Sequence, residues 1–185
     1  TTLTARGAFP DDSPQHMGMP GMHGCVSAVL SMQQADLLIA LGTRFDDRVT
    51  GDVKSFAPHA KVIHVDIDAA EISKIRHADV PIVGDLKEVV ATLLRALPQA
   101  YKQYGRPDLT PWMKSLTKLK DKYPAYFDDT LDGLVSPQKA IKVLDEVSDD
   151  DAIVVTGVGQ HQMWASQFMT YRYPRTYISL SLIHI

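Results

Sequence analysis

Four charged side chains follow a continuous apolar run, and their types and spacing suit the binding of an anion. The charged residues are Arg44, Asp46, Asp47 and Arg48. The apolar run, residues 37–41, stops at Gly42, a pattern typical of a strand buried on both faces of a parallel sheet. Open α/β sheets bind ligands at the carboxyl ends of their strands, and guanidinium groups grip phosphates or carboxylates. The turn is therefore a candidate site for an anionic cofactor, or alternatively a solvated turn whose charges pair with one another.

Carboxylates also follow two further apolar segments. Asp66 and Asp68 end a β-branched run at residues 61–68, and Asp85 follows a short strand expected at residues 80–84. They are candidate acceptors for a nucleotide ligand, although each could equally cap a following helix. His64 alternates with apolar neighbours and is expected to be a packed core histidine.

A second glycine turn lies near the end of the chain. The expected strand at residues 151–156 leads into Gly157, Gly159 and His161, and an apolar helix is expected from Met163. Strand, glycine turn and helix form a phosphate-binding geometry. Gln162 stands where a dinucleotide fingerprint has its third glycine, so the motif alone is weak, and His161 could instead be a solvent-facing turn residue.

Composition excludes several classes of protein. The chain has 185 residues, is 45% hydrophobic and 22% charged, and has a net charge of −3, which gives no support to nucleic-acid binding. No apolar run approaches the ~20 residues of a membrane span, and no signal peptide is visible. The single cysteine, Cys25, fits a reducing cytoplasmic compartment and excludes an internal disulfide or a cysteine-based zinc site. The histidines form no helical i, i+4 pair, so no metal site is expected.

Strands and helices alternate in a way that indicates a parallel α/β sheet. Residues 17–24, rich in glycine and methionine, predict a tight loop. The expected helices span residues 25–36, 69–76, 86–97, 112–123 and 137–147. In the third of these, an apolar stripe is formed by Leu86, Val89, Val90, Leu93, Leu94 and Leu97. The proline-rich stretch 98–135 is expected to be a connection between domains, and a new α/β unit begins at Ser136-Pro137, an N-cap followed by a first-turn proline.

Four segments together resemble the large catalytic subunit of the acetohydroxyacid (acetolactate) synthase family. They are LGTRFDDRVTG at 41–51, GMHG at 21–24, VDID at 65–68 and VGQHQMW at 158–164. The match runs in order over residues 1 to about 179. The arginine turn by itself is similar to the wider family of thiamine-diphosphate enzymes with a sirtuin-like central domain.

The resemblance implies a domain layout. Residues 1–97 would be the second half of a Rossmann-like (sirtuin-like) FAD-binding domain with a parallel sheet, 98–135 an interdomain linker, and 136–179 the start of a parallel α/β thiamine-diphosphate domain. Residues 180–185 (LSLIHI) depart from the family pattern. They match the translated end of a common sequencing-transposon adaptor and are expected to be a non-native tail, which re-sequencing the locus would test.

The resemblance also implies cofactor contacts. The residues that would contact FAD are Thr2, Leu3, Gly21, Met22, His23, Gly42, Thr43, Arg44, Asp46, Arg48, Val49, Asp66, Ile67, Gly84, Asp85 and Leu86. Those that would meet thiamine diphosphate are Val158, Gly159, Gln160 and His161. The family's catalytic glutamate and its Mg²⁺ ligands belong to segments outside this sequence, so no residue here is assigned a catalytic role and the isolated chain is expected to be inactive.

The activity implied for the parent protein is a transferase reaction of branched-chain amino-acid biosynthesis. Two pyruvates, or pyruvate and 2-ketobutyrate, would condense with loss of CO₂, using thiamine diphosphate, Mg²⁺ and a largely architectural FAD. The implied partners are a second catalytic subunit, in a homodimer or tetramer, and a regulatory small subunit. The alternatives are a glyoxylate carboligase, a pyruvate oxidase, an inactive FAD- or nucleotide-binding module, and a sirtuin-like NAD-binding protein.

Overall fold

A computed structural model describes residues 1–129 and 133–179, so the expected tail at 180–185 lies outside the described residues. The chain divides into two compact units. One unit is Met32–Ser115, and the other joins residues 1–31 to the chain from Leu116 onward. The boundaries between the units fall within two helices, α1 (Val26–Gln34) and α4 (Thr110–Lys122). Among the described residues, no helix is long and apolar enough to cross a membrane.

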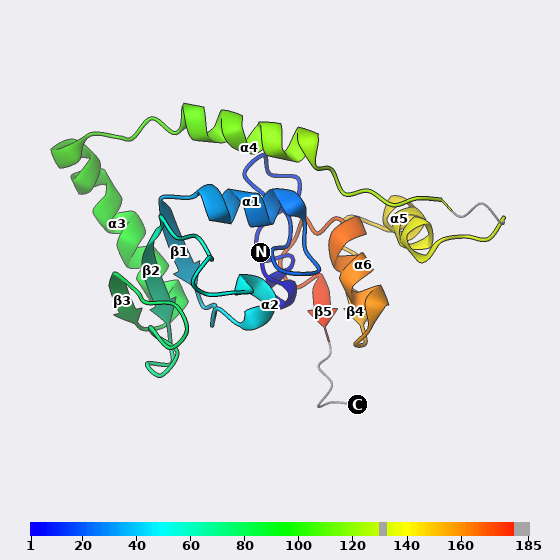
Figure 1. The fold of residues 1–185 in the computed structure, drawn as a ribbon, viewed down its shortest axis with the longest axis horizontal. Coiled ribbons are helices and arrows are strands. Elements are labelled where there is room, and N and C mark those ends of the chain that lie inside the picture. Colours follow the sequence, from blue (N-terminus) through cyan, green and yellow to red (C-terminus); the bar gives the residue numbers. More distant parts are fainter. Residues whose placement is uncertain (130–132, 180–185) are drawn as a thin grey trace. The chain divides into compact units, whose positions relative to one another are not determined.

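The Met32–Ser115 unit is built on a parallel sheet, as predicted (Figure 1). Its strands are β1 (Leu37–Leu41), β2 (Lys61–Asp66) and β3 (Val80–Val83), in that order across the sheet. β-Branched residues, which favour extended backbone, dominate β2 and β3. The register pairs Leu41 with Val65 and Asp66 with Val83. All three strands therefore end at the same edge of the sheet, where ligands bind in α/β folds.

The core of this unit covers one face of β1. Ala40 and Val62 pack there with Phe45, Phe56, Ala57 and Ala60, and Met32 and Leu38 lie against them. The opposite face of β1 carries Leu37, Ile39 and Leu41, which are 44–53% exposed. The expectation that residues 37–41 are buried on both faces is therefore wrong for this chain, because the described residues supply a core on one side only.

Helix α3 (Leu86–Tyr104) begins where the sequence predicts and ends later. Asp85 is its N-cap and accepts hydrogen bonds from the amides of Lys87 and Glu88 at 2.8 and 3.4 Å. The helix continues through Pro98, which removes one backbone hydrogen bond, because the residues that follow are good helix formers. It ends at Gly105, whose φ is 81°. Helix α3 contacts β2, but no residue of the helix is buried.

The helix predicted at residues 69–76 is absent, and that segment forms turns. Asp66 Oδ1 accepts the amide of Asp68, and Asp68 Oδ1 accepts the amide of Ala70, both at 2.9 Å. Such side-chain bonds offer the backbone an alternative to helix. Ser73, with φ of 60°, places a left-handed residue where a helix would have to continue.

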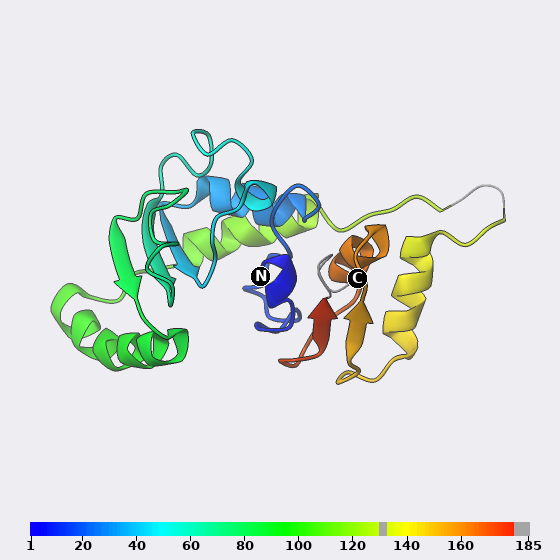
Figure 2. The same cartoon turned by 90° about the horizontal axis from the view of Figure 1, so that it is seen from below.

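The other unit contains a smaller parallel sheet (Figure 2). It pairs β4 (Val154–Thr156) with β5 (Tyr177–Ser179), and helix α6 (Gln160–Phe168) crosses between them. Helix α5 (Pro137–Val147) packs against α6. Ser136 caps α5 as predicted, accepting the amide of Lys139 at 3.3 Å. β4 is shorter than the predicted strand at 151–156.

The N-terminal loop belongs to the same unit as this smaller sheet. It carries the short 3₁₀ helix η1 (Leu3–Ala5), which contacts β5. The amide of Asp11 donates to the Tyr171 carbonyl, and the Asp11 carboxylate accepts the Tyr171 amide, both at 3.0 Å. The predicted boundaries at 97 and 135 remain predictions, although α3 and α4 show that the proposed linker contains helix.

Candidate functional site

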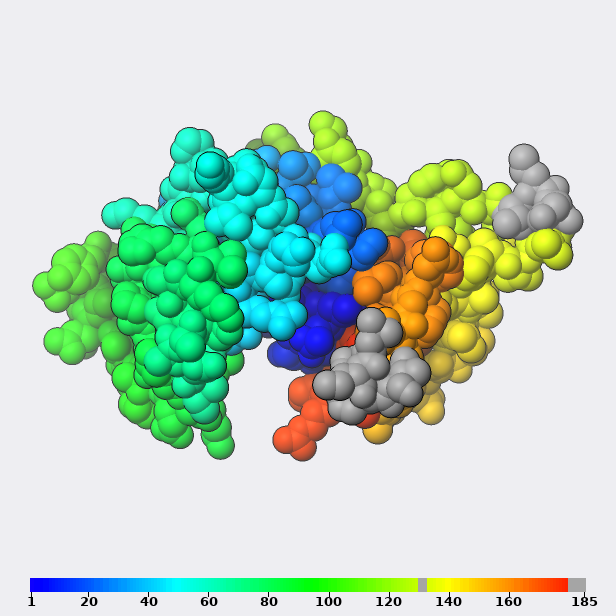
Figure 3. All heavy atoms as spheres, turned by 60° about the horizontal axis from the view of Figure 1, so that its bottom comes forward, coloured from blue at the N-terminus to red at the C-terminus, as the bar shows by residue number. Residues whose placement is uncertain are grey.

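The carboxyl edge of the larger sheet brings three predicted cofactor segments together. The amide of Gly42 donates to the Val65 carbonyl at 2.8 Å, and the amide of Gly84 donates to the Asp66 carbonyl at 2.9 Å. The turn after β1, the end of β2 and the turn after β3 therefore lie side by side. The segment after β1, in cyan in Figure 3, lies at the surface of its unit.

The backbone of the first turn is sharply bent. Gly42 has φ of 64°, and a Cβ built on it would meet nothing within 4 Å. A ligand could therefore approach this backbone closely. Phe45, with φ of 54°, points into the core and is 5% exposed. The turn thus alternates between a buried anchor and exposed charged side chains.

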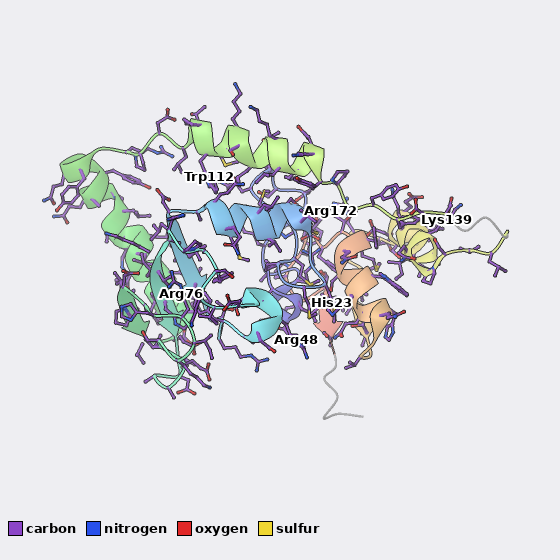
Figure 4. The ribbon with its side chains drawn as sticks, in the orientation of Figure 1. His23, Arg48, Arg76, Trp112, Lys139 and Arg172 are labelled. Atoms are coloured by element: carbon purple, nitrogen blue, oxygen red, sulfur yellow. The ribbon has the colours of Figure 1, made fainter. Side chains whose placement is uncertain are left out.

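The charges of this turn partly satisfy one another. Arg44 Nε lies 3.2 Å from Asp46 Oδ2, and the Arg44 side chain is 70% exposed. The other carboxylate oxygen of Asp46 accepts the amide of Arg48 at 3.1 Å and caps the single-turn helix α2 (Asp47–Thr50). Arg48, labelled in Figure 4, lies on that helix and is exposed.

Self-pairing in the turn does not exclude ligand binding. An exposed ion pair stabilises a protein by about 0–1 kcal/mol, so the Arg44 guanidinium can exchange Asp46 for a phosphate at little cost. Asp46, in contrast, uses both carboxylate oxygens within the turn. Its observed role is to organise the turn.

The neighbouring strand ends carry the other predicted residues. Ile67 is 72% exposed beside Asp66, and Leu86 is 38% exposed at the start of α3. Asp85 acts as a helix cap, the alternative that its sequence position allowed. Asp66 bonds to the Asp68 amide through Oδ1, and a carboxylate can accept several further hydrogen bonds. Exposed apolar and carboxylate groups at one edge suit the adenosine end of a dinucleotide.

The remaining predicted FAD contacts lie in the other unit. Thr2 and Leu3 are at the start of η1, and Gly21, Met22 and His23 form a tight loop. The amide of Cys25 closes the loop on the Met19 carbonyl at 2.7 Å, and Gly21 has φ of 105°. Met22 is 64% exposed, and His23, labelled in Figure 4, is exposed beside it.

The predicted thiamine-diphosphate segment forms the start of α6. The helix begins at Gln160, three residues before the predicted start at Met163. Gly159 is its N-cap, with φ of 154° and no side-chain cap bond. A Cβ on Gly159 would lie 3.1 Å from the His161 ring, so this ring folds back over the glycine turn. Val158 is partly buried, whereas Gln160 and His161 are exposed.

Three side chains have roles in the structure that sequence patterns did not indicate. His64 Nε2 lies 2.8 Å from the Thr43 carbonyl. Arg76, labelled in Figure 4, donates to the carbonyls of Ala57 and Ala60 at 3.2 Å. Gln167, on α6, donates to the His23 carbonyl. The alternation of apolar residues around His64 predicts that its side chain is buried, and the structure confirms this. The sequence gives no sign of the hydrogen bonds, because their backbone acceptors are distant along the chain.

The described residues contain no group of three or more metal-ligating side chains that could hold an ion.

Comparison with known proteins identifies the family of this chain. Residues 1–93 match the family model described as "Thiamine pyrophosphate enzyme, central domain". The chain is 55% identical over 179 residues to acetolactate synthase of Mycobacterium leprae, and 51% identical to the acetolactate synthase large subunit of Corynebacterium glutamicum. It is 44% identical to the chloroplastic acetolactate synthase of Arabidopsis thaliana. Each match covers 97% of this chain and 26–28% of the relative, so the chain spans little more than a quarter of their length.

Proposed function

This chain belongs to the thiamine pyrophosphate enzyme family, and from that premise we propose that it is part of the large subunit of an acetolactate synthase. The parent enzyme would condense two pyruvates, or pyruvate and 2-ketobutyrate, with loss of CO₂. Its product would enter branched-chain amino-acid biosynthesis. The observation that carries the proposal is the 51–55% identity to bacterial acetolactate synthases over nearly the whole chain.

We propose that the carboxyl edge of the β1–β2–β3 sheet holds FAD. Arg44 and Arg48 would neutralise the pyrophosphate, and the open backbone of Gly42 would allow its close approach. Asp66 would accept a hydrogen bond from the adenosine portion. The groups at this edge fit an anionic dinucleotide because the guanidinium groups are exposed and the Cβ-free backbone of Gly42 lies two residues before Arg44.

The other proposed flavin contacts are Thr2, Leu3 and the loop of Gly21, Met22 and His23. The exposed thioether of Met22 can pack on a flat ring system. In the same unit, Val158, Gly159, Gln160 and His161 would meet thiamine diphosphate, which supplies carbanion chemistry when bound. The Mg²⁺ ligands are proposed to lie in other parts of the parent protein.

The proposed partners follow from the same assignment. The parent would associate with a second catalytic subunit, as a dimer or tetramer, and with a regulatory small subunit. A relative from Mycobacterium tuberculosis is named as a large subunit, IlvB1. The proposed compartment is the cytoplasm, and the substrates are small 2-ketoacids.

FAD titration of the 185-residue chain, followed by flavin fluorescence, tests the proposed site. We expect saturable FAD binding that Arg44→Ala weakens by about tenfold, since it removes a charge-assisted contact. The matched control is Arg95→Ala, on the exposed face of α3, which should leave the affinity unchanged. Binding of NAD in place of FAD would contradict the assignment and favour a sirtuin-like NAD-binding protein.

An activity assay tests the rest of the proposal. The isolated chain is expected to form no acetolactate from pyruvate with thiamine diphosphate, Mg²⁺ and FAD, whereas the full-length parent should do so. A parent that forms tartronate semialdehyde from glyoxylate, or acetyl phosphate from pyruvate, would instead be a carboligase or oxidase of the same family.

A further inference from the structure

We propose that His64 is a positioning residue for the charged turn after β1, because its imidazole fixes the backbone from which Arg44 reaches an anionic ligand. The inference deepens the proposed function and rests on it where flavin binding is concerned. His64 itself would not touch the ligand, since its side chain is buried within the unit and is only 1% exposed.

The hydrogen bond between His64 and the turn defines this role. Nε2 of His64 lies 2.8 Å from the carbonyl oxygen of Thr43. A carbonyl oxygen only accepts, so the tautomer that makes this bond carries its proton on Nε2. The bond joins a residue inside β2 to the turn after β1, one residue before Arg44. It therefore sets the direction in which the backbone leaves the sheet.

Packing of the imidazole ring supplies a second constraint. The Phe45 ring meets His64 edge-on, with centroids 5.1 Å apart, and meets Phe56 at 6.1 Å. Phe45 has φ of 54°, a left-handed conformation that is unfavourable for an aromatic residue. Burial against the two rings offsets that strain. His64 thus holds the residues on both sides of Arg44, Thr43 by a hydrogen bond and Phe45 by ring contact.

The other imidazole nitrogen distinguishes positioning from ordinary core packing. Nδ1 of His64 is buried and has no hydrogen-bond partner, which makes histidine a costly choice for filling the core. An apolar residue of similar size would remove that unmade bond but would also leave the Thr43 carbonyl without its donor, so the two effects on stability oppose each other. The advantage of histidine at this position should therefore appear in ligand binding.

Two substitutions with side chains of similar length separate the effect of the hydrogen bond from the effect of side-chain volume. His64→Gln retains an N–H donor near the position of Nε2, whereas His64→Met has none. The control Val62→Ala removes a fully buried side chain from the same face of β2 without removing the contact to Thr43. The readouts for the 185-residue chain are FAD affinity, melting temperature and amide hydrogen exchange at Arg48 to Gly51, whose amides bond to Asp46 and Asp47.

The expected pattern is specific to a positioning role. His64→Met should weaken FAD binding about tenfold and speed exchange in α2, whereas His64→Gln should stay within about threefold of wild type. Val62→Ala should lower the melting temperature and leave the affinity unchanged. Equal affinity and exchange for His64→Met and wild type would overturn the inference. If wild type binds no FAD, the flavin site proposed for this chain fails, and exchange in α2 still decides whether His64 holds the turn.

Discussion

Arg6 and Asp11 form a buried ion pair, with side chains that are 3% and 8% exposed. One guanidinium nitrogen donates to Asp11 Oδ1 at 2.9 Å, and the other donates to Oδ2. The guanidinium also lies over the Tyr171 ring, 5.1 Å from its centroid. Because Asp11 also exchanges backbone contacts with Tyr171, this pair ties the N-terminal loop to the segment that leads into β5.

Breaking this pair should be costly. Asp11→Asn leaves the Arg6 guanidinium buried without a compensating charge, and such losses destabilise proteins by about 3–5 kcal/mol. Urea denaturation of the 185-residue chain measures the change. The adjacent Asp12→Asn is the matched control, because Asp12 is exposed and its carboxylate lies as far as 3.8 Å from the Arg172 guanidinium. This substitution should lower the free energy of unfolding by less than about 1 kcal/mol. Equal losses for the two variants would contradict this account.

His16 should make the stability of the same unit depend on pH. Its Nε2 lies 3.1 Å from a guanidinium nitrogen of Arg6 and 3.3 Å from Asp11 Oδ1. Burial lowers the pKa of His16 to about 4, the positive charges of Arg6, Lys120 and the terminal amine act in the same direction, and Asp11 opposes them. The folded state therefore binds the proton less readily than the unfolded chain.

The sign of the pH effect follows from that lowered pKa. The contribution of His16 to stability should be fully present above pH 6.5 and should be lost as the pH falls toward 4. Its size should be on the order of 3 kcal/mol. Denaturation curves at pH 4.5 and pH 7.5 should differ less for His16→Gln than for wild type. An unchanged pH dependence in the variant would show that His16 does not titrate on unfolding.

The glycine-methionine loop should tolerate no side chain at Gly24. A Cβ there would lie 2.1 Å from the Met19 carbonyl oxygen and 2.6 Å from the Pro20 carbonyl carbon. Both are backbone atoms, so the loop itself would have to move. Gly24→Ala should destabilise the chain by about 2 kcal/mol or more, lowering its melting temperature by several degrees. Gly157→Ala is the control, since its nearest neighbour is the His161 ring at 3.6 Å, and an unchanged melting temperature for Gly24→Ala would contradict the prediction.

Local sequence signals predicted the sheet, and they failed where side chains compete for nearby backbone amides. The apolar run ending at Gly42 and the β-branched run before Asp66 predicted strands of a parallel sheet, because each pattern depends on the residues of its own segment. The turns at residues 69–76 were missed because Asp66 and Asp68 bond to backbone amides two residues onward. A pattern based on helical periodicity does not register that competition.

The candidate sites show a different division, between local and distant information. The charged turn was predictable because its arginines directly follow a strand. The anchor of that turn was not, because His64 is 21 residues from Thr43. Likewise, Arg6 and Tyr171 are far apart in sequence, and only folding brings the guanidinium and the ring together. Residues that support a site from another element leave no local pattern of composition or spacing.

Asp85 offers a decisive test of a residue with two interpretations. Its carboxylate caps α3 through the amides of Lys87 and Glu88, and it also lies at the proposed flavin edge. Asp85→Ala should cost about 1 kcal/mol by removing the cap. Asp85→Asn should retain most of the stability, because asparagine caps helices about as well as aspartate. Urea denaturation measures both changes.

FAD affinity then separates the two roles of Asp85. If Asp85 serves only as a cap, Asp85→Asn should bind FAD as tightly as wild type. A variant that keeps wild-type stability and binds FAD several-fold more weakly would show instead that the carboxylate meets the flavin. Loss of stability in Asp85→Asn equal to that in Asp85→Ala would contradict the capping geometry, because the amide oxygen of asparagine can accept the same two backbone hydrogen bonds.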